Sequence, residues 1–410
     1  TLGRPAFAIT CGGYRLIDLL KSSFDAPILA AVRPYLAAIQ AADWPDTLLN
    51  LARSDRPTLF VNARLAPTIR AMTHLQSLTR QTGDQVIVDR DELVACWIQD
   101  PSRYFDSAGS LVQNLLLASN SDTVGTQATQ TDTTADELPL QLFSYPHDLI
   151  RLHMANISEN LEHRAVVGSY QQTADGVYAA AGVQCSSHTV FDTRKGPIIL
   201  DEDCQIGPFS YLRGPVYVGR GARVTEHASL KDGVCLGHTT KVGGEIECSI
   251  LEPYSNKQHH GFLGHSWLGS WINLGAGTSN SDLKNTYGTV NMRYGQEKVP
   301  TGMQFVGCFV GDYAKTAINT SIFTGKTIGV GSMVYGFATS NVPSFVNYAP
   351  SLGHLTEMSL SAMVATQARM FARRNVPQRP CDIALLESMY ELTRADRSEL
   401  GELPSEPIAW

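Results

Sequence analysis

The sequence predicts an α/β domain followed by a parallel β-helix, and three observations support this fold class. Aliphatic residues recur every six positions in the middle of the chain, from about residue 183 to residue 342. Strand-like and helix-like segments alternate before residue 145, as in α/β domains, and helical patterns return after residue 350. The predicted domains are an α/β domain at 1–145, a connecting helix at 146–165, the β-helix at 166–350 and a helical segment at 351–410.

The six-residue period holds over eight consecutive positions, all of them aliphatic: Leu200, Ile206, Leu212, Val218, Val224, Leu230, Leu236 and Val242. A fixed short period is typical of a solenoid, whereas a helix repeats every 3.6 residues and a strand every two. Each unit is expected to form one short strand and one corner of a triangular coil, with the aliphatic side chain inside. The small residue that follows is expected at the corner, where Gly adopts a positive φ freely; it is Gly207, Gly219, Gly237 and Gly243 in four of the units.

The period is interrupted twice. It returns through Phe262, Leu268 and Leu274, and again between Val310 and Val334. The two segments that lack it are Glu252–Gly261 and Ser279–Phe305. Interruptions of a solenoid are where loops leave the coil, often on the binding face, so a loop is expected at each.

Outside the repeat, shorter patterns indicate the elements of the α/β domain. Strands are expected at Thr58–Val61 and Gln85–Val88, and helices at Ile28–Ala42 and Ala66–Thr79. Residues 119–137 are almost purely polar and contain no aromatic residue, so a surface loop without regular structure is expected there.

Composition narrows the class of function. A net charge of −7 argues against a nucleic-acid binder held by phosphate neutralisation. The chain has no run of 18 apolar residues and no signal-peptide pattern, so no membrane span and a cytoplasmic location are expected. The eight cysteines form no Cys-x-x-Cys pair, which favours reduced core thiols over a disulfide frame or a zinc site.

Several motifs carry a family resemblance. The segment Gly261–Asn285 (GFLGHSWLGSWINLGAGTSNSDLKN) resembles the acetyltransferase half of the bifunctional bacterial enzyme that makes UDP-N-acetylglucosamine, which combines N-acetylglucosamine-1-phosphate uridyltransferase and glucosamine-1-phosphate acetyltransferase activities. Motifs LGRP at 2–5, LFVNARLAP at 59–67 and CQIGPFSYLRGPVYVG at 204–219 are similar to those of a divergent bacterial branch of sugar nucleotidyltransferases. The resemblance covers nearly the whole chain.

The resemblance implies a left-handed β-helix of the hexapeptide-repeat type and a nucleotidyltransferase-like (Rossmann-like) N-terminal domain. It implies acetyl-CoA as co-substrate and an amino-sugar 1-phosphate and a nucleotide sugar as ligands. It also implies a homotrimer, because the related enzymes build each acetyl-transfer site between neighbouring β-helices. Mg²⁺ is the cofactor it suggests for the N-terminal domain.

Two features depart from the family pattern. The nucleotidyltransferase half of the family opens with a Gly-rich loop that holds phosphates through backbone N–H groups, and the nearest candidate here, Cys11-Gly12-Gly13, has different surroundings. Either the first strand and loop precede Thr1, or the domain binds a sugar nucleotide without making one. Phe262 stands where the related acetyltransferases place a substrate-contacting Tyr.

Acyl transfer to an amine requires a general base, oxyanion donors and a groove for acyl-CoA. The resemblance places the base at His259, with His260 and His265 as rivals, and a sugar-phosphate ligand at Arg213. The other candidates are Lys257 and Lys284 for phosphate, Asn273 and Phe262 for the sugar, Gly311, Ala314 and Lys315 for acyl-CoA, and, for a nucleotide sugar, Arg4, Asn62 and Arg64. A purely structural role, such as packing, capping or an amide ladder, stays open for each.

Three functions stay open. The first is acyl transfer to an amino-sugar phosphate, with no protein-bound metal. The second is a zinc enzyme of the carbonic-anhydrase-like β-helix type, with His227, His260 and His265 as ligands. The third is a non-catalytic sugar-nucleotide sensor or scaffold, which the missing Gly-rich loop favours. A basic cluster, Arg369, Arg373 and Arg374, indicates either a solvated helix face or a site for an anion.

Overall fold

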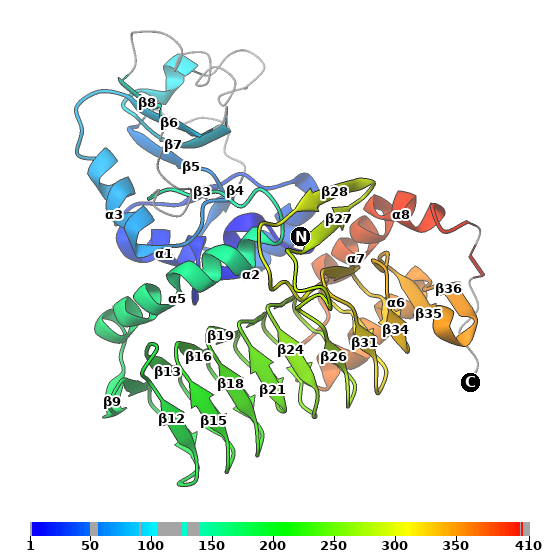
Figure 1. The fold of residues 1–410 in the computed structure, drawn as a ribbon. Helices are drawn as coiled ribbons and strands as arrows, with labels where there is room; N and C mark the ends of the chain where they lie inside the picture. Colours follow the sequence, from blue (N-terminus) through cyan, green and yellow to red (C-terminus); the bar gives the residue numbers. More distant parts are fainter. Residues whose placement is uncertain are drawn as a thin grey trace. The chain divides into compact units, whose positions relative to one another are not determined.

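The computed structural model describes residues 2–49, 56–89, 92–104, 125–128, 139–401 and 403–404. The chain divides into two compact units, which are coloured along the sequence in Figure 1. The N-terminal unit comprises Arg4–Thr10 and Tyr14–Ser144, and the β-helix unit comprises Thr1–Gly3, Cys11–Gly13 and Tyr145–Trp410.

The N-terminal unit is built on a four-stranded sheet in the order β5-β7-β6-β8. Strand β7 is antiparallel to both of its neighbours, and β8 is parallel to β6. Helices α1 and α3 supply Leu16, Leu19 and Leu75 to a core that they share with Ile87 and Val94 of the sheet. The elements are η1 (Ala6–Ala8), β2 (Tyr14–Arg15), α1 (Leu16–Ser23), β3 (Leu29–Ala30), η2 (Pro34–Leu36), α2 (Ala37–Asp43), β4 (Leu48–Leu49), β5 (Thr58–Val61), α3 (Ile69–Leu78), β6 (Gln85–Asp89), β7 (Glu92–Ile98), η3 (Pro101–Tyr104) and β8 (Gly125–Ala128).

In this unit both expected strands and one expected helix are confirmed, the other helix is shorter than expected, and the expected loop contains a strand. The strands β5 and β6 lie where the sequence predicts them, and α3 starts behind Thr68, whose side chain accepts a hydrogen bond from the Ala71 amide. The helix expected over Ile28–Ala42 is wrong before Pro34, which disfavours helical backbone at Arg33; Pro34–Leu36 form the 3-10 helix η2, and the α-helix begins at Ala37. Of the polar segment 119–137, the structure describes only β8, which is a strand and not a loop.

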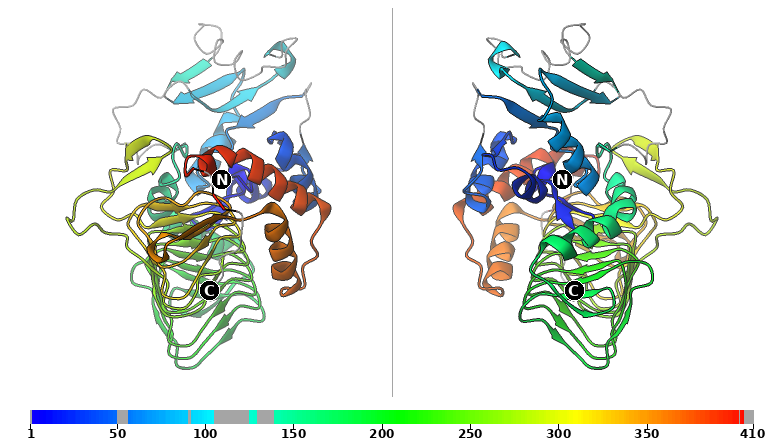
Figure 2. Two further views of the ribbon diagram at one scale, coloured as in Figure 1. Left: turned by 90° about the vertical axis from the view of Figure 1, so that its right-hand side faces the viewer. Right: turned by 90° about the vertical axis from the view of Figure 1, so that its left-hand side faces the viewer.

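The β-helix unit is a stack of triangular coils with three parallel sheets as its faces, seen nearly along the stack in Figure 2. Face 1 contains β10 (Val177–Ala179), β13 (Ile198–Leu200), β16 (Val216–Val218), β19 (Val234–Leu236), β22 (Ile250–Leu251), β25 (Trp267–Leu268), β29 (Cys308–Val310) and β32 (Lys326–Ile328), with β9 (Gln171–Ala174) antiparallel at its edge.

Faces 2 and 3 complete the prism. Face 2 contains β11 (Gln184–Cys185), β14 (Gln205–Ile206), β17 (Arg223–Val224), β20 (Lys241–Val242), β23 (Asn256–Lys257), β30 (Lys315–Thr316), β33 (Met333–Val334) and β35 (Val346–Ala349), with β36 (His354–Glu357) antiparallel to β35. Face 3 contains β12 (Val190–Asp192), β15 (Tyr211–Arg213), β18 (Ser229–Lys231), β21 (Glu245–Glu247) and β24 (Phe262–Gly264), continued by β26 (Ser279–Asn280), β31 (Ser321–Ile322) and β34 (Phe337–Ala338).

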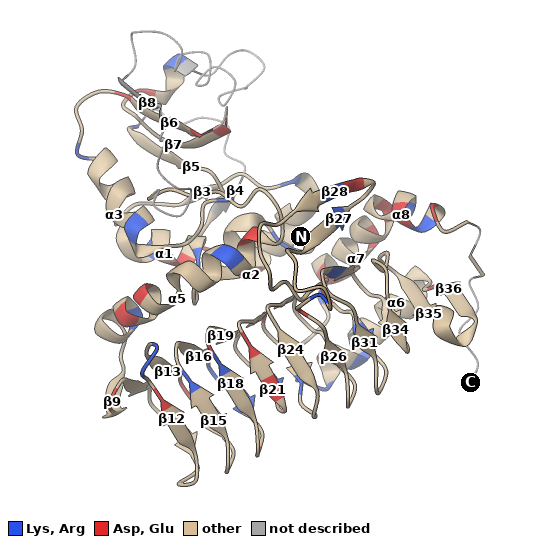
Figure 3. Ribbon diagram, viewed as in Figure 1, with Lys and Arg blue, Asp and Glu red and all other residues tan. Residues whose placement is uncertain are grey.

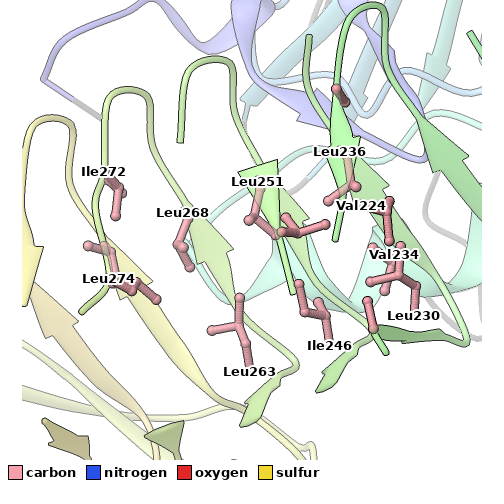
Figure 4. Packing of buried hydrophobic residues seen from close by; sticks show 14 of the residues in the cluster. Val224, Leu230, Val234, Leu236, Ile246, Leu251, Leu263, Leu268, Ile272 and Leu274 are labelled. Atoms are coloured by element: carbon pink, nitrogen blue, oxygen red, sulfur yellow. The ribbon is translucent and has the colours of Figure 1, made fainter. Parts of the chain in front are cut away.

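The interior of the prism is the predicted aliphatic column. All eight positions from Leu200 to Val242 are buried in one continuous core, part of which is drawn in Figure 4. Burying each such side chain contributes about 1.5–3 kcal/mol, so the stack is held chiefly by this column and by the parallel strand pairing between coils. The predicted left-handed β-helix fold is confirmed.

The glycines that follow the aliphatic positions are required for a different reason from the one expected. Gly207, Gly219 and Gly237 do not have a positive φ. A Cβ at Gly219 would lie 2.5 Å from the Leu236 carbonyl oxygen of the next coil, and the other two are equally close to the coil above. The left-handed backbone falls two residues later in each case, for example at Gly221 with a φ of 61°. These glycines therefore allow close approach between coils.

The first expected interruption is wrong and the second is confirmed. Residues 252–261 stay in the coil, because β23 pairs with β20 and places Lys257 beside Val242. The period fails there because this coil is shorter, so that Leu263, and not Phe262, enters the core. Between Ser281 and Val306 the chain does leave the coil and forms the hairpin β27 (Asn291–Tyr294) and β28 (Glu297–Pro300).

Helix α5 (Asp148–Val167) covers part of face 1. The His153 ring bonds to the Gly233 carbonyl oxygen at 2.7 Å, and the Arg164 guanidinium lies 4.6 Å from the centre of the Tyr217 ring. Outward side chains of this face, such as Ile199 and Cys235, are therefore fully buried.

The C-terminal segment is helical, as expected. It contains α6 (Leu360–Ala372), α7 (Pro380–Leu392) and α8 (Arg394–Ser398), after the short η4 (Pro350–Leu352) and β36. Phe371 of α6 packs on Trp271, with ring centroids 4.3 Å apart, and Trp271 stacks in turn on Tyr254 at the corner between faces 1 and 2. None of the helices in the described part of the chain is long and apolar enough to cross a membrane.

Candidate active site of the β-helix

The acyltransferase candidates do not form one cluster within a single chain. Asn273 and Lys315 are paired across neighbouring coils on face 2. Arg213 and Phe262 belong to β15 and β24 of face 3. His259 lies at the corner between these two faces, after β23 and before β24. The candidates therefore occupy two faces and the edge that joins them.

His259 is exposed at this corner. Its imidazole makes no hydrogen bond with any residue in the described part of the chain, and no loop leaves the coil beside it. Its carbonyl oxygen accepts a hydrogen bond from the Lys257 ammonium. The backbone at His259 is therefore held from inside the coil while the ring stays accessible.

Lys257 lies inside the coil, with 2% of its surface exposed. Its ammonium donates to the Gly243 carbonyl oxygen at 2.9 Å and to that of His259. Burial lowers the pKa of Lys257 to about 8. Because its nitrogen is directed at interior carbonyls, this lysine ties two coils together and does not present its charge to a phosphate.

Basic side chains on face 3 are already paired with carboxylates. The Arg213 guanidinium forms two hydrogen bonds with Asp232, one of them 2.8 Å from Nε to Oδ1, and this contact raises the pKa of Arg213. Lys231 lies 2.6 Å from Glu245 and 3.3 Å from Glu247. Figure 3 shows these basic strands, β15 and β18, in blue beside the acidic strand β21 in red. A phosphate at Arg213 would compete with Asp232.

A histidine–carboxylate pair lies at the far edge of face 3. His265 Nδ1 is 2.8 Å from Asp282 Oδ2, and both side chains are largely buried. The His265 ring also stacks against Phe305, with centroids 5.2 Å apart. A carboxylate on Nδ1 fixes the tautomer and leaves Nε2 as a proton acceptor, which is the arrangement of an oriented general base. Sequence reasoning named His265 but missed Asp282.

The remaining acyltransferase candidates have distinct surroundings. The exposed Asn273 accepts a 3.4 Å hydrogen bond from the Asn256 amide. Lys284 donates to the Thr289 carbonyl oxygen at 2.8 Å, in the segment that leaves the coil. Ala314 is buried in the β-helix core, so only its backbone can line a groove. Lys315 donates to the Tyr313 carbonyl oxygen at 3.0 Å, and burial lowers its pKa to about 8.

Gly311 is constrained by the next coil. Its amide donates to the Ile328 carbonyl oxygen at 2.8 Å, and a Cβ there would lie 2.8 Å from the Val330 nitrogen. It therefore supports coil stacking, whatever else it contacts.

The candidate residues of the N-terminal unit also serve its own structure. The Asn62 amide donates to the Leu93 carbonyl oxygen at 2.8 Å, and its oxygen accepts from the Arg64 amide at 3.0 Å. Arg64 pairs with Glu92, and its guanidinium also donates to the Phe143 carbonyl oxygen. Arg4 is half-buried. These contacts stabilise the ends of β5 and β7.

The Cys11-Gly12-Gly13 segment, the nearest candidate for a phosphate loop, binds α5. The Gly12 amide donates to His153 Nδ1 at 2.9 Å, and Asn160 and Arg164 donate to the carbonyl oxygens of Gly12 and Gly13. Burial lowers the pKa of His153 to about 4, so the ring is neutral and its Nε2–H donates to Gly233. The Gly12 amide is thus committed to a histidine.

Metal ligands are not grouped in the described part of the chain. No set of three His, Cys, Asp or Glu side chains there could hold a metal ion. His265 is engaged by Asp282, and His227 stacks on Phe209. The described residues therefore do not fit the three-histidine zinc site, nor do they provide a ready set of ligands for Mg²⁺ in the N-terminal unit.

Comparison with known proteins finds similarity to a nucleotidyl transferase family model and to bifunctional relatives. Residues 1–165 match the family model described as sugar nucleotidyl transferase. The bifunctional sugar-1-phosphate nucleotidylyltransferase/acetyltransferase of Sulfurisphaera tokodaii is 30% identical over 149 residues, which are 36% of this chain and 37% of that protein. The bifunctional protein GlmU of Thermotoga petrophila is 24% identical over 216 residues, 48% of this chain and 44% of that protein.

The resemblance drawn from the sequence is thereby confirmed at modest identity: residues 1–165 are similar to the sugar nucleotidyl transferase family model, and the relatives are named as a bifunctional sugar-1-phosphate nucleotidylyltransferase/acetyltransferase and as the bifunctional protein GlmU. The chain spans less than half the length of these relatives. Among solved structures, the UDP-N-acetylglucosamine acyltransferase of Francisella novicida matches 55% of this chain and 78% of its own, with 13% identity and a TM-score of 0.28.

Proposed function

We propose that the β-helix transfers an acetyl group from acetyl-CoA to the amine of an amino-sugar 1-phosphate. The observation that carries this proposal is the coil between Asn256 and His265, which presents His259 exposed at one corner and His265 bound to Asp282 at the next. Histidine bases suit this reaction, because an ammonium group must lose a proton before its nitrogen can attack. The acetyltransferase activity named for the Sulfurisphaera tokodaii relative supports the same reaction class.

In the proposed reaction, a neutral imidazole removes a proton from the sugar amine. The amine nitrogen attacks the thioester carbonyl carbon, the C–N bond forms, the C–S bond breaks, and the CoA thiolate leaves and is protonated. The resemblance favours His259 as the base, and the geometry favours His265 as the second candidate, because only His265 has a carboxylate that orients its ring. The two are separated by the variants described in the Discussion.

The proposal includes a homotrimer. The candidate residues lie on faces 2 and 3 of the prism. In a trimer, face 3 of one chain would meet face 2 of a neighbouring chain, and the two faces together would form one site. Face 3 and its edges carry exposed apolar side chains that are typical of an interface: Phe305, Ile318, Phe323 and Phe337. Closed threefold symmetry would cover these side chains in all three copies.

For the N-terminal unit we propose binding of a nucleotide sugar, with little or no nucleotidyl transfer by this chain. The Gly12 amide, the nearest candidate donor to a phosphate, is bound to His153. Pyrophosphate release from UTP and N-acetylglucosamine 1-phosphate at a rate typical of enzymes would contradict this. We propose a cytoplasmic location, which the eight free thiols support.

The test of the main proposal is product identification. The full chain is incubated with acetyl-CoA and each of a panel of amino-sugar 1-phosphates, and the sugar product is measured by mass spectrometry. A gain of one acetyl group on one sugar phosphate, dependent on the protein, is the expected result. Acetylation of none of the panel would overturn the proposal for this substrate class.

A second function, a sugar-nucleotide sensor without turnover, is favoured by one specific observation. The basic groups Arg213 and Lys231 of face 3 are both neutralised by carboxylates of the same chain. A site for a sugar phosphate on this face would then need positive charge from other residues. Saturable binding of UDP-N-acetylglucosamine in calorimetry, with no acetyl transfer to any amino-sugar phosphate, would support this alternative.

A further inference from the structure

Face 2 carries a column of outward-pointing polar side chains. Only some of them belong to the candidate residues described above. Arg223 pairs in register with Lys241, and Lys241 with Asn256. Bridges then continue the column from Asn256 to Asn273 and from Asn273 to Lys315. Strands of neighbouring coils lie about 4.8 Å apart, so consecutive side chains of the column are direct neighbours.

The end of α6 adds two arginines to this column. Phe371 anchors the helix on Trp271 at the corner beside face 2. Immediately after the helix, the half-buried Arg374 donates a 2.7 Å hydrogen bond to the Asn256 side-chain oxygen. Arg373 precedes it in the chain. A segment 118 residues away in sequence is thereby fixed over the middle of the column.

Four cations meet here without a carboxylate. Arg223, Lys241, Arg373 and Arg374 form no ion pair with any residue that the structure describes. The pKa of Lys241 is lowered by burial and then by Arg374, Arg223 and Arg373, and no acidic group opposes this. Arg213 and Lys231 on face 3, by contrast, each contact a carboxylate.

Such a cluster is unusual in this chain, which has 39 acidic residues against 32 Lys and Arg. Like charges gathered around the half-buried Lys241 and Arg374 repel one another, and the repulsion is relieved when an anion binds between them. Guanidinium groups match the oxygen geometry of phosphate, and an amide beside them can donate to a further oxygen.

We propose that Arg223, Lys241, Arg373 and Arg374, with the Asn256 amide, bind a phosphoryl group on face 2. The site is separate from His259, from the His265–Asp282 pair and from Arg213. Phosphoryl binding at this site does not depend on whether the protein transfers acetyl groups. The phosphoryl group is either that of a sugar phosphate or a phosphate of a nucleotide such as the adenosine end of CoA, and both offer the same dianionic oxygens.

The test is calorimetric titration of the full chain at low ionic strength, where screening is weak. Three probes are used: adenosine 3′,5′-bisphosphate, glucosamine 1-phosphate and inorganic phosphate. Arg223→Gln and the double variant Lys241→Gln/Arg374→Gln remove the proposed ligands. Arg369→Gln is the matched control, because Arg369 lies on the same helix, is exposed and bonds to Thr366.

At least one probe is expected to bind the unmodified protein, and its identity names the source of the phosphoryl group. The double variant should weaken that binding about 100-fold and Arg223→Gln about tenfold, since a charge-assisted hydrogen bond contributes roughly a factor of ten. Arg369→Gln should bind as the unmodified protein does. Arg223→Gln keeps the test decisive if loss of the Arg374–Asn256 contact loosens α6, because Arg223 forms no hydrogen bond or ion pair with α6 in the described part of the chain.

Thermal unfolding gives an independent readout. Lys241→Gln removes one like charge, so the Tm of the β-helix without ligand should rise, and the stabilisation by the binding probe should disappear. Binding of none of the three probes, or binding equal in Arg223→Gln, in the double variant and in Arg369→Gln, would overturn the proposal. So would a Tm of Lys241→Gln that falls while its response to the probe persists.

Discussion

His265 Nδ1 lies 2.8 Å from Asp282 Oδ2, and the two residues are 17 positions apart in the sequence. The same separation divides Leu251 from Leu268, which are paired on consecutive coils. Stacking of one short coil on the next therefore brings the imidazole and the carboxylate together. The carboxylate accepts the Nδ1 proton, which leaves Nε2 free to accept another.

The first prediction concerns this pair. If His265 is the base, Asp282→Asn should lower kcat by about 10² to 10⁴, because the wrong tautomer is then favoured, with little change in either Michaelis constant. The measurement is steady-state acetyl transfer. His227→Ala, a corner histidine that stacks on Phe209, is the matched control and should keep full activity. An unchanged kcat in Asp282→Asn would remove His265 from the mechanism.

The second prediction concerns pH and the interior lysine. The pKa of Lys257 falls from 10.5 to about 8 in the folded state, so above pH 8 the unfolded chain holds more protons than the native one. The free energy of unfolding should therefore rise with pH between about 8 and 10.5, and Lys257 should contribute roughly 3 kcal/mol of that rise. Lys257→Met should lack that part of the rise.

The measurement is the free energy of unfolding of both proteins across this window. The difference between them isolates Lys257, because Lys315, whose pKa is also lowered to about 8, titrates in both. Parallel pH profiles for the two proteins would contradict the assignment. At neutral pH, Lys257→Met leaves the carbonyl oxygens of Gly243 and His259 without their donor.

The third prediction separates the two reasons for glycine in the coil. Gly219→Ala places a Cβ 2.5 Å from a backbone oxygen of the next coil, which cannot move without breaking strand pairing. Gly221→Ala meets no atom within 4 Å but has a φ of 61°. Gly221→Ala should lower the free energy of unfolding by about 1–2 kcal/mol, and Gly219→Ala should lower it clearly more. Equal thermal stabilities would show that close approach is not the constraint at Gly219.

The fourth prediction tests the trimer. Light scattering should give three times the chain mass of 44.6 kDa at micromolar concentration. Phe337→Glu on face 3 should yield monomers, because it places a charge in the proposed interface. Leu392→Glu on α7 is the matched control, since Leu392 is 55% exposed and Phe337 is 53% exposed. A monomeric unmodified protein, or a trimer in Phe337→Glu, would count against the interface.

The sequence alone predicts the regular part of the fold and little of the site. The column from Leu200 to Val242 is predictable because core packing demands an aliphatic residue at every sixth position. The period fails near Lys257 because two coils are shorter, and a lysine there fills an inward position by reaching interior carbonyls.

Contacts between coils are the part that sequence reasoning missed. The His265–Asp282 pair depends on a local coil length that no period revealed, and Arg374 reaches Asn256 only through the docking of α6. The spacing of the glycines indicates the coil, but the reason for glycine there is close approach to the neighbouring coil and not a positive φ.

The most direct test of the central claim is thiol release from acetyl-CoA in the presence of an amino-sugar 1-phosphate, measured for the unmodified protein, His259→Ala and His265→Ala. We predict robust release by the unmodified protein and a loss of about 10² to 10⁴ in kcat for the variant that lacks the base. Release that is unaffected by both substitutions, or absent in the unmodified protein for every amino-sugar phosphate, would contradict acetyl transfer at this site.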